Sequence, residues 1–128
     1  MSRCAPAEDL VRTLVEAAIA GASPAGLLEA LCRAMVAGGL PLARASAGAL
    51  LVHPLLDATL VIWRPDRGAY LDDTPRPVVR GNEAWRDSPF HLLDLAGEVQ
   101  HRYRLERGEG TGRFAVLAEL RAEGATDY

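Results

Sequence analysis

Lysine is absent from this 128-residue sequence, and all 14 basic residues are arginine. The chain therefore has no P-loop lysine, no Schiff-base lysine and no lysine general base, which excludes the sites built on one. Acidic residues number 17, so the formal net charge is −3. Because a nucleic-acid interface needs an excess of positive charge, nucleic acid is not an expected partner.

Cysteine is scarce as well. Cys4 and Cys32 have no second cysteine or histidine beside them at metal-ligand spacing, so neither a zinc site nor a disulfide framework is predicted. We expect Cys32 in the core of a helix and Cys4 on a loose terminus. No apolar run reaches the roughly 18–20 residues of a membrane helix, and charges interrupt any signal-peptide core. These absences predict a cytoplasmic protein with no membrane partner.

The overall composition is that of an ordinary globular protein. Apolar residues make up 49% and charged residues 24% of the sequence. Residues 1–64 carry 5 arginines and 5 acids, whereas residues 65–128 carry 9 arginines and 12 acids. The charge-poor first half is therefore expected to be the more buried or the more self-associating part. The length suits one domain, since domains run to roughly 100–200 residues.

A pair of helices joined by a short turn is predicted over residues 8–38. Acidic residues occupy the first turn of the first helix, and Gly21 ends it in a left-handed conformation. Ser23 is a good N-cap, Pro24 suits the first helical position, and Gly38-Gly39 ends the second helix. The apolar stripes comprise Leu10, Val11, Leu14, Ala18 and Ile19 in the first helix, and Leu27, Leu28, Leu31, Met35 and Val36 in the second.

Strands are predicted next. Residues 41–52 are small and apolar, and residues 58–63 are rich in β-branched and aromatic side chains. Residues 65–68 have the composition of a turn. The stretch from there to Gly81 contains two prolines and is expected to be an edge strand or a loop.

The C-terminal third returns to helix. Ser88-Pro89 predicts a helix start, with Gly97 as its end. The alternation of side chains over residues 99–105 predicts a strand. Residues 113–123 are predicted to form a helix that has Phe114, Leu117 and Leu120 on one side and is ended by Gly124. The run Gly108, Gly110 and Gly112 lies beside two acids that would repel a phosphate, so we interpret it as a flexible connection.

No catalytic or metal-binding residue and no cofactor is predicted. His53, His91 and His101 are isolated from other ligands, Asp72-Asp73 suits a solvated turn, and Ser88 suits a helix cap. Trp85 stands among polar residues, a placement typical of an aromatic that lines a groove or an interface. The candidate pocket or interface residues are Trp63, Trp85, Phe90, His91 and Tyr103.

Several segments resemble the N-terminal region of bacterial class III adenylate/guanylate cyclases, over about residues 10–128. Trp85-Arg86-Asp87-Ser88-Pro89-Phe90, followed by Leu92-Leu93, is similar to the family's W-x-x-S-P-F-x-x-L-L stretch. The other matching segments are 28–32 with 39–45, His53-Pro54-Leu55, and 117–121 with Gly124-Ala125-Thr126-Asp127-Tyr128.

The resemblance implies a GAF-like regulatory module that precedes a cyclase catalytic domain. It implies an α/β (α+β) fold with a helical pair packed on a mainly antiparallel sheet, forming a single domain over 1–128 that is incomplete at its C-terminus. The cyclase's metal-binding and nucleotide-reading residues have no counterparts here, so the chain itself is not expected to be an enzyme. The expected partners are a second copy, bound through the N-terminal helices, and a downstream cyclase domain.

The residues leave one alternative open. His91, Asp94 and His101 lie within one stretch, and His91 and Asp94 are three residues apart, close enough to touch on a helix. A small stand-alone ligand-binding protein or enzyme that uses this region is the alternative hypothesis.

Overall fold

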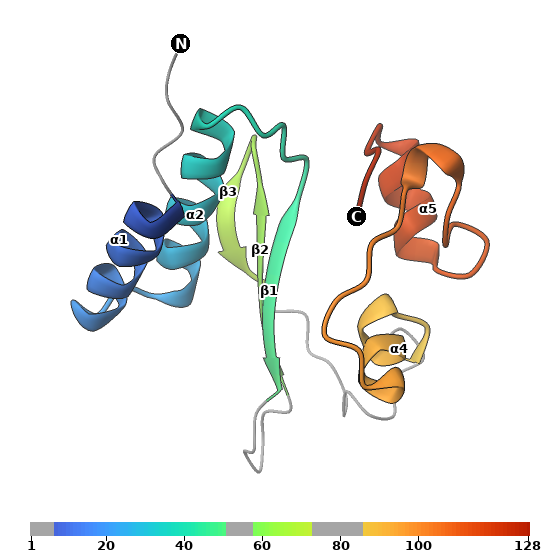
Figure 1. Ribbon diagram of the computed structural model, residues 1–128, viewed down its shortest axis with the longest axis horizontal. Helices are drawn as coiled ribbons and strands as arrows, with labels where there is room; N and C mark the ends of the chain where they lie inside the picture. The colour runs from blue at the N-terminus through green and yellow to red at the C-terminus, as the bar shows by residue number, and fades with distance from the viewer. Residues whose placement is uncertain (1–6, 51–57, 73–85) are drawn as a thin grey trace. The chain divides into compact units, whose positions relative to one another are not determined.

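The computed structural model describes residues 7–50, 58–72 and 86–128, and its elements make a mixed α+β protein (Figure 1). The chain divides into two compact units, Met1–Thr74 and Pro75–Tyr128, called here the N-terminal and C-terminal units. The first contains α1 (Ala7–Ile19), α2 (Pro24–Ala37), β1 (Ala45–Leu50), β2 (Ala58–Arg64) and β3 (Gly68–Leu71). The second contains α4 (Pro89–Ala96), the 3-10 turn η2 (Leu105–Arg107) and α5 (Ala115–Ala122). A single domain over 1–128 stays a prediction.

The predicted helical pair is confirmed, and local chemistry sets its boundaries. Gly21, with φ +91°, follows α1 in the left-handed region that glycine adopts at little cost. The Ser23 hydroxyl accepts a hydrogen bond from the Gly26 N–H at 3.1 Å, and Pro24 opens α2. Gly38 caps the C-terminus of α2, as expected.

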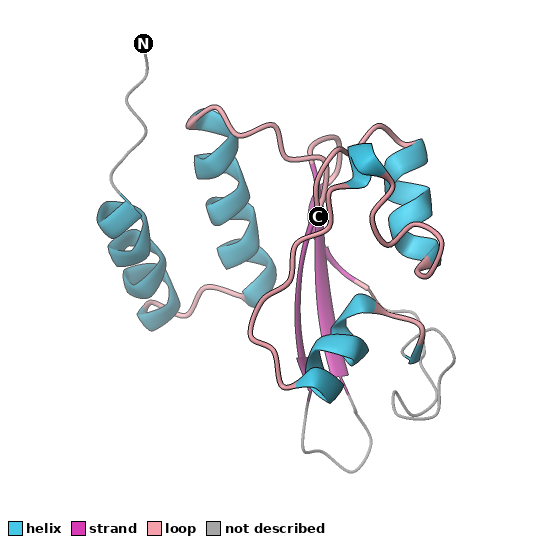
Figure 2. Ribbon diagram, turned by 45° about the vertical axis from the view of Figure 1, so that its right-hand side comes forward, coloured by secondary structure: helices cyan, strands magenta, loops and turns pink. Residues whose placement is uncertain are grey.

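The three strands form an antiparallel sheet in the order β1-β2-β3 (Figure 2). Ala45 pairs with Trp63, and Ile62 pairs with Tyr70. The strand predicted over 58–63 and the turn over 65–68 are confirmed. For the stretch after this turn, an edge strand or a loop was expected, and β3 is an edge strand. The strand predicted over 41–52 begins later, at residue 45, because Pro41 has no N–H and Leu42 donates instead to the Leu40 carbonyl at 2.9 Å. Residues 51–52 lie outside the described part.

The N-terminal core lies between α2 and one face of this sheet, and α1 packs on α2 (Figure 1). Leu28 and Cys32, four residues apart on α2, are buried against Val61 and Trp63 of β2. The core position predicted for Cys32 is confirmed, with 1% exposure. The predicted α2 stripe is wrong at Val36, which is 44% exposed although it continues the four-residue spacing of Leu28 and Cys32, so burial along this line of α2 ends at Cys32.

The C-terminal unit has its own core around α5. Phe114, Leu117 and Leu120 are buried, as predicted, together with Tyr103 and Leu105. Helix α4 begins as predicted, with the Ser88 hydroxyl accepting from the His91 N–H, and ends at Gly97, with φ +64°.

The strand predicted over residues 99–105 is wrong. Tyr103 forms reciprocal backbone hydrogen bonds with Tyr128, at 2.8 and 2.9 Å, and Leu105 already begins η2. Tyr103 and Leu105 are buried in the core around α5, whereas Val99 is fully exposed. The apparent period of two therefore reflects these two buried residues and not a strand. A period of two shows which side chains share a face but does not show whether a neighbouring strand exists.

The glycine run is a series of packed turns rather than a loose connection. It follows η2 and not a strand, and the Gly110 carbonyl accepts from the N–H groups of Arg113 and Phe114. Gly110 has φ +73°, and a Cβ there would lie 2.7 Å from the Leu117 side chain and 2.8 Å from that of Tyr103. Only glycine satisfies both constraints.

Candidate functional site

Helix α1 exposes a line of aliphatic side chains. Val11, Val15 and Ile19, spaced four residues apart, are 59%, 51% and 82% exposed, and α1 has no buried residue. We call these three residues the α1 apolar face. Leu10 and Leu14 are partly buried on the neighbouring side of the helix.

Charged residues border the α1 apolar face rather than interrupt it. Arg12 forms an ion pair with Asp9 at 3.3 Å, and Thr13 donates to the Asp9 carbonyl at 2.9 Å. These polar groups are satisfied within the helix itself. The face therefore remains apolar, and burying an aliphatic side chain contributes roughly 1.5–3 kcal/mol when it is complete.

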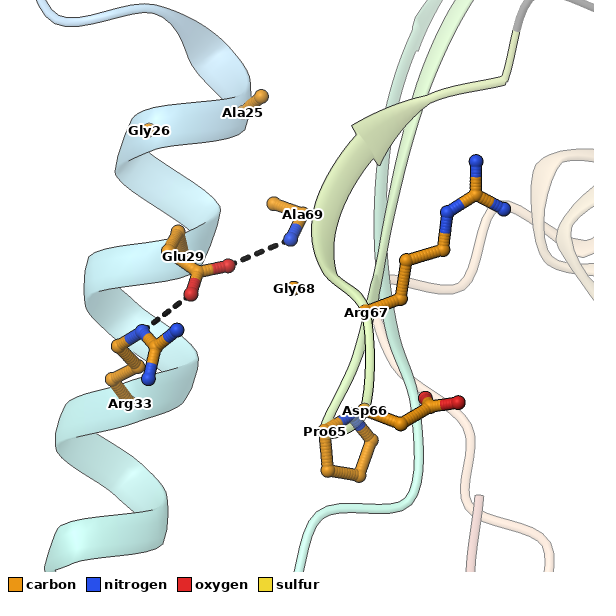
Figure 3. A pocket seen from close by; sticks show the side chains of 9 residues that line it. All are labelled: Ala25, Gly26, Glu29, Arg33, Pro65, Asp66, Arg67, Gly68 and Ala69. Atoms are coloured by element: carbon orange, nitrogen blue, oxygen red, sulfur yellow. Dashed lines mark hydrogen bonds and ion pairs between the residues drawn. The ribbon is translucent and has the colours of Figure 1, made fainter.

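A shallow recess of about 440 Å³ lies between α2 and the β2–β3 turn (Figure 3). Glu29 lies at its centre: one carboxylate oxygen accepts from the Ala69 N–H at 2.6 Å, and the other accepts from the Arg33 guanidinium. Gly68 allows this approach, because a Cβ at that position would lie 2.9 Å from the Glu29 carboxylate. Glu29 thus joins the hairpin to the helix.

The recess offers little chemistry. Its two acids, Glu29 and Asp66, are balanced by Arg33 and Arg67. The two turn residues, Asp66 and Arg67, point away from α2 in Figure 3. Among the residues that the structure describes, no nucleophile or histidine lines the recess. We interpret the recess as a structural contact between helix and hairpin.

Cys32 is not a reactive thiol. Burial raises the pKa of its thiol, and the Glu29 carboxylate raises it further. Since the thiolate is the nucleophilic form, a raised pKa keeps this cysteine neutral and inert at neutral pH.

The candidate residues Trp63 and Tyr103 belong to two different cores. Trp63 is 4% exposed and packs in the N-terminal unit, and Tyr103 is 8% exposed and packs against Phe114 in the C-terminal unit. Phe90 is 48% exposed on α4, where the adjacent His91 is partly buried. Trp85, and also Cys4 and His53, lie outside the described residues. A shared pocket for the five candidates stays a prediction.

The alternative histidine region is mostly solvent-facing. His101 is exposed, stacks obliquely on Tyr103 with ring centroids 4.4 Å apart, and has its Nδ1 3.4 Å from a Glu98 carboxylate oxygen. Asp94 is exposed on α4. Within the described ranges, no three histidine, cysteine or carboxylate side chains come together as a metal site would require.

Two features of the candidate site could have been sought in the sequence but were not predicted from it. The predicted stripe merged the two apolar sides of α1 and left out Val15, although the four-residue spacing of Val11, Val15 and Ile19 was visible. No role was predicted for Glu29, whose partner Ala69 lies 40 residues away and has no side-chain signal.

Comparisons with family models, with curated proteins and with solved structures each found no match to this chain. Among the described residues, no helix combines the length and the apolar character that crossing a membrane requires.

Proposed function

We propose that this chain is a non-catalytic regulatory module that self-associates through α1 and acts on a downstream class III cyclase domain. The observation that carries the proposal is the α1 apolar face, with Val11, Val15 and Ile19 each more than half exposed. Contiguous exposed aliphatic side chains at helical spacing are typical of surfaces that bind a partner.

A second copy is the occupant that this face fits. Two α1 helices that pack face to face bury the same aliphatic line on each, and a two-fold arrangement makes one surface self-complementary. The formal charge of α1 is −2, from Glu8, Asp9 and Glu16 against Arg12, and these residues lie beside the α1 apolar face, where salt screens the repulsion between copies.

The resemblance to the cyclase region, with its GAF-like fold, supplies the regulatory part of the proposal. A class III catalytic site forms between two domains, as the resemblance implies, so control of dimer geometry is control of activity. A cytoplasmic location belongs to the same proposal and is consistent with the free Cys32 thiol.

Self-association is tested with Val15→Glu, which places a charge in the middle of the α1 apolar face. Val36→Glu on α2 is the matched control, because Val36 is also an exposed helical valine, with 44% exposure. Light scattering after size-exclusion chromatography is expected to give a dimer for the wild type and for Val36→Glu, and a monomer for Val15→Glu. Circular dichroism of all three checks that the helices remain folded.

A wild-type chain that is monomeric at high concentration would contradict self-association. The regulatory part is tested separately by fusing the chain ahead of a class III catalytic domain. Val15→Glu is then expected to change cyclase turnover at least several-fold, whereas Val36→Glu leaves it unchanged. Equal turnover for the wild type and Val15→Glu would overturn the regulatory part.

A further inference from the structure

The two sides of the α1 apolar face differ in character. Successive residues of a helix are about 100° apart, so the residues before and after each face residue lie on opposite sides of it. Arg12 and Glu16 each follow a valine of the face, and both are exposed. Leu10 and Leu14 each precede one of the same valines, and both are partly buried. We call the first pair the charged flank and the second pair the aliphatic flank.

The charged flank holds an acid that has no cation to pair with. Glu16 forms no ion pair in the described part of the chain, although it lies four residues after Arg12 on the same helix. Arg12 pairs with Asp9 through one terminal nitrogen, and its side chain is 67% exposed. A guanidinium has five N–H donors, so Arg12 keeps donors for a second carboxylate. The flank therefore offers one acid and one base to a partner.

Two closely aligned helices related by a two-fold axis are either parallel or antiparallel. In the parallel pair the axis runs along the helices, and the charged flank of each copy meets the aliphatic flank of the other. In the antiparallel pair the axis runs across the helices, so like flanks meet. A charge placed against leucine loses water without gaining a partner, which costs free energy. The composition of the two flanks therefore favours the antiparallel pair.

One register of the antiparallel pair satisfies both charges of the flank. Leu14 is two residues from Arg12 and two from Glu16. When the two-fold axis crosses α1 at the level of Leu14, Arg12 of each copy lies level with Glu16 of the other. Two crossed ion pairs then form, and each joins a charged flank to its symmetry mate.

The aliphatic side chains fit at the same register. Val11 lies three residues before the level of Leu14, so it meets the second copy between Val15 and Ile19. The two copies of Val15 lie close together on either side of the axis. Side chains of one helix that enter the spaces between those of the other are the usual form of helix packing.

The acidic first turn of α1 favours the same arrangement. Glu8 and Asp9 lie in this turn. A parallel pair would set the two first turns side by side, with four carboxylates together. In the antiparallel pair the two Glu8 levels are six residues on either side of the axis, which is about 18 Å along the helix. This distance exceeds the Debye length of about 8 Å at physiological ionic strength, so their repulsion is screened.

We propose that a second copy binds the α1 apolar face in the antiparallel orientation, with Arg12 of each copy paired to Glu16 of the other. This inference rests on the proposed self-association and specifies how the second copy lies. The crossed pairs lie at the edge of the interface, where charges determine orientation and register more than affinity.

Disulfide trapping of the full chain in a Cys4→Ser background measures the orientation. At the proposed register Val11 of one copy and Ile19 of the other differ by about 3 Å along the helix axis. The two copies of Val11 differ by about 9 Å, and the two copies of Ile19 by about 15 Å, which a disulfide does not span. A mixture of Val11→Cys and Ile19→Cys chains, one with a longer tag, is expected to form the mixed disulfide on mild oxidation. Val36→Cys on α2 is the control and is expected to form none.

Charge reversal tests the crossed pairs. Arg12→Glu and Glu16→Arg are each expected to raise the dimer Kd at least threefold, because each sets like charges level with one another at both pairs. An equimolar mixture of the two variants is expected to restore dimerisation, since every crossed pair then joins an acid to an arginine. Analytical ultracentrifugation measures the Kd values.

Glu8→Arg is the matched control for net charge. Like Glu16→Arg, it changes the formal charge of α1 from −2 to 0, but it lies away from the crossed pairs. An effect of net charge alone would lower Kd for both variants, whereas the crossed pairs raise it for Glu16→Arg only. Equal Kd values for these two variants would overturn the crossed pairs.

The orientation and the self-association fail in different ways. Disulfides between two Val11→Cys chains and between two Ile19→Cys chains, in place of the mixed disulfide, would overturn the antiparallel orientation and leave the self-association intact. A wild type that is monomeric at high concentration would overturn both.

Discussion

At the scale of single residues, this protein relies on a few positions whose role depends on distant partners. Gly110 shows this most clearly, because its φ of +73° and its contact with Leu117 and Tyr103 both exclude a side chain. Gly112 has open space around the position of a Cβ, although the two glycines are equivalent in the sequence pattern. The sequence predicted a glycine-rich connection, but only packing distinguishes the required glycine from the tolerant one.

Arg102 and Asp127 tie the C-terminal tail to the segment before η2. The Arg102 Nε donates to the two Asp127 oxygens at 2.8 and 3.0 Å, and this hydrogen bond is the main reason that the pKa of Asp127 is lowered. A lowered pKa in the folded state means that the unfolded state takes up protons first as the pH falls. The stabilisation is therefore present above roughly pH 4, the unfolded carboxyl value, and is lost as the pH falls through the folded pKa.

We predict that Asp127→Asn lowers Tm slightly at pH 7, because an exposed pair contributes little. The Tm difference between wild type and variant is expected to shrink as the pH falls through the lowered folded pKa of Asp127, because the wild-type carboxyl then becomes neutral as well. Thermal unfolding followed by circular dichroism from pH 2 to pH 7 measures this difference. Glu119→Gln, on an exposed acid of α5, is the control. A Tm difference that stays constant across the range would contradict the assigned role of Asp127.

At the scale of elements, the parts of the fold that sequence predicted well are those fixed by local chemistry. The starts of α2 and α4 follow from Ser23-Pro24 and Ser88-Pro89, and the β2–β3 turn follows from its composition. The strand predicted over 99–105 failed because its period of two comes from contact with α5. Segments that need a partner far along the chain carry no local signal of that partner.

The contact between α2 and the β2–β3 hairpin is one that local signals did not predict, and it provides a second test. Glu29→Ala removes the acceptor of the partly buried Ala69 N–H, and we expect a loss of about 1–3 kcal/mol in the free energy of unfolding. Arg33→Ala removes only the exposed partner, whose side chain is 72% exposed, and is expected to cost less than about 1 kcal/mol. Urea denaturation of both variants measures the difference. Equal losses would show that the Glu29–Arg33 pair, and not the Ala69 contact, carries the stabilisation.

At the scale of the whole molecule, composition and length suggested one domain, whereas the structure has two compact units with separate cores. Two cores of similar composition cannot be distinguished by residue counts, because the hydrophobic pattern shows which residues are buried but not which ones bury one another. The candidate set shows the same limit, since Trp63 and Tyr103 are both buried aromatics, as their residue types suggest, yet belong to different cores.

Cys32 provides a way to ask whether the two units unfold together. It is 1% exposed in the N-terminal core, and its raised pKa keeps it unreactive until that core opens. In a Cys4→Ser background, labelling of Cys32 by a thiol reagent reports opening of the N-terminal unit alone. Whether or not the units are independent, Glu29→Ala is expected to increase the labelling rate about tenfold or more, since about 1.4 kcal/mol is a factor of ten in an opening equilibrium.

Gly110→Ala is the matched perturbation of the other unit, where strain and overlap with Leu117 destabilise only the C-terminal core. It is expected to leave the labelling rate of Cys32 within twofold of the Cys4→Ser parent. An increase equal to that of Glu29→Ala would instead mean that the two cores open as one cooperative unit. That result would favour the single domain predicted from the sequence, because the separate cores would then share one unfolding transition.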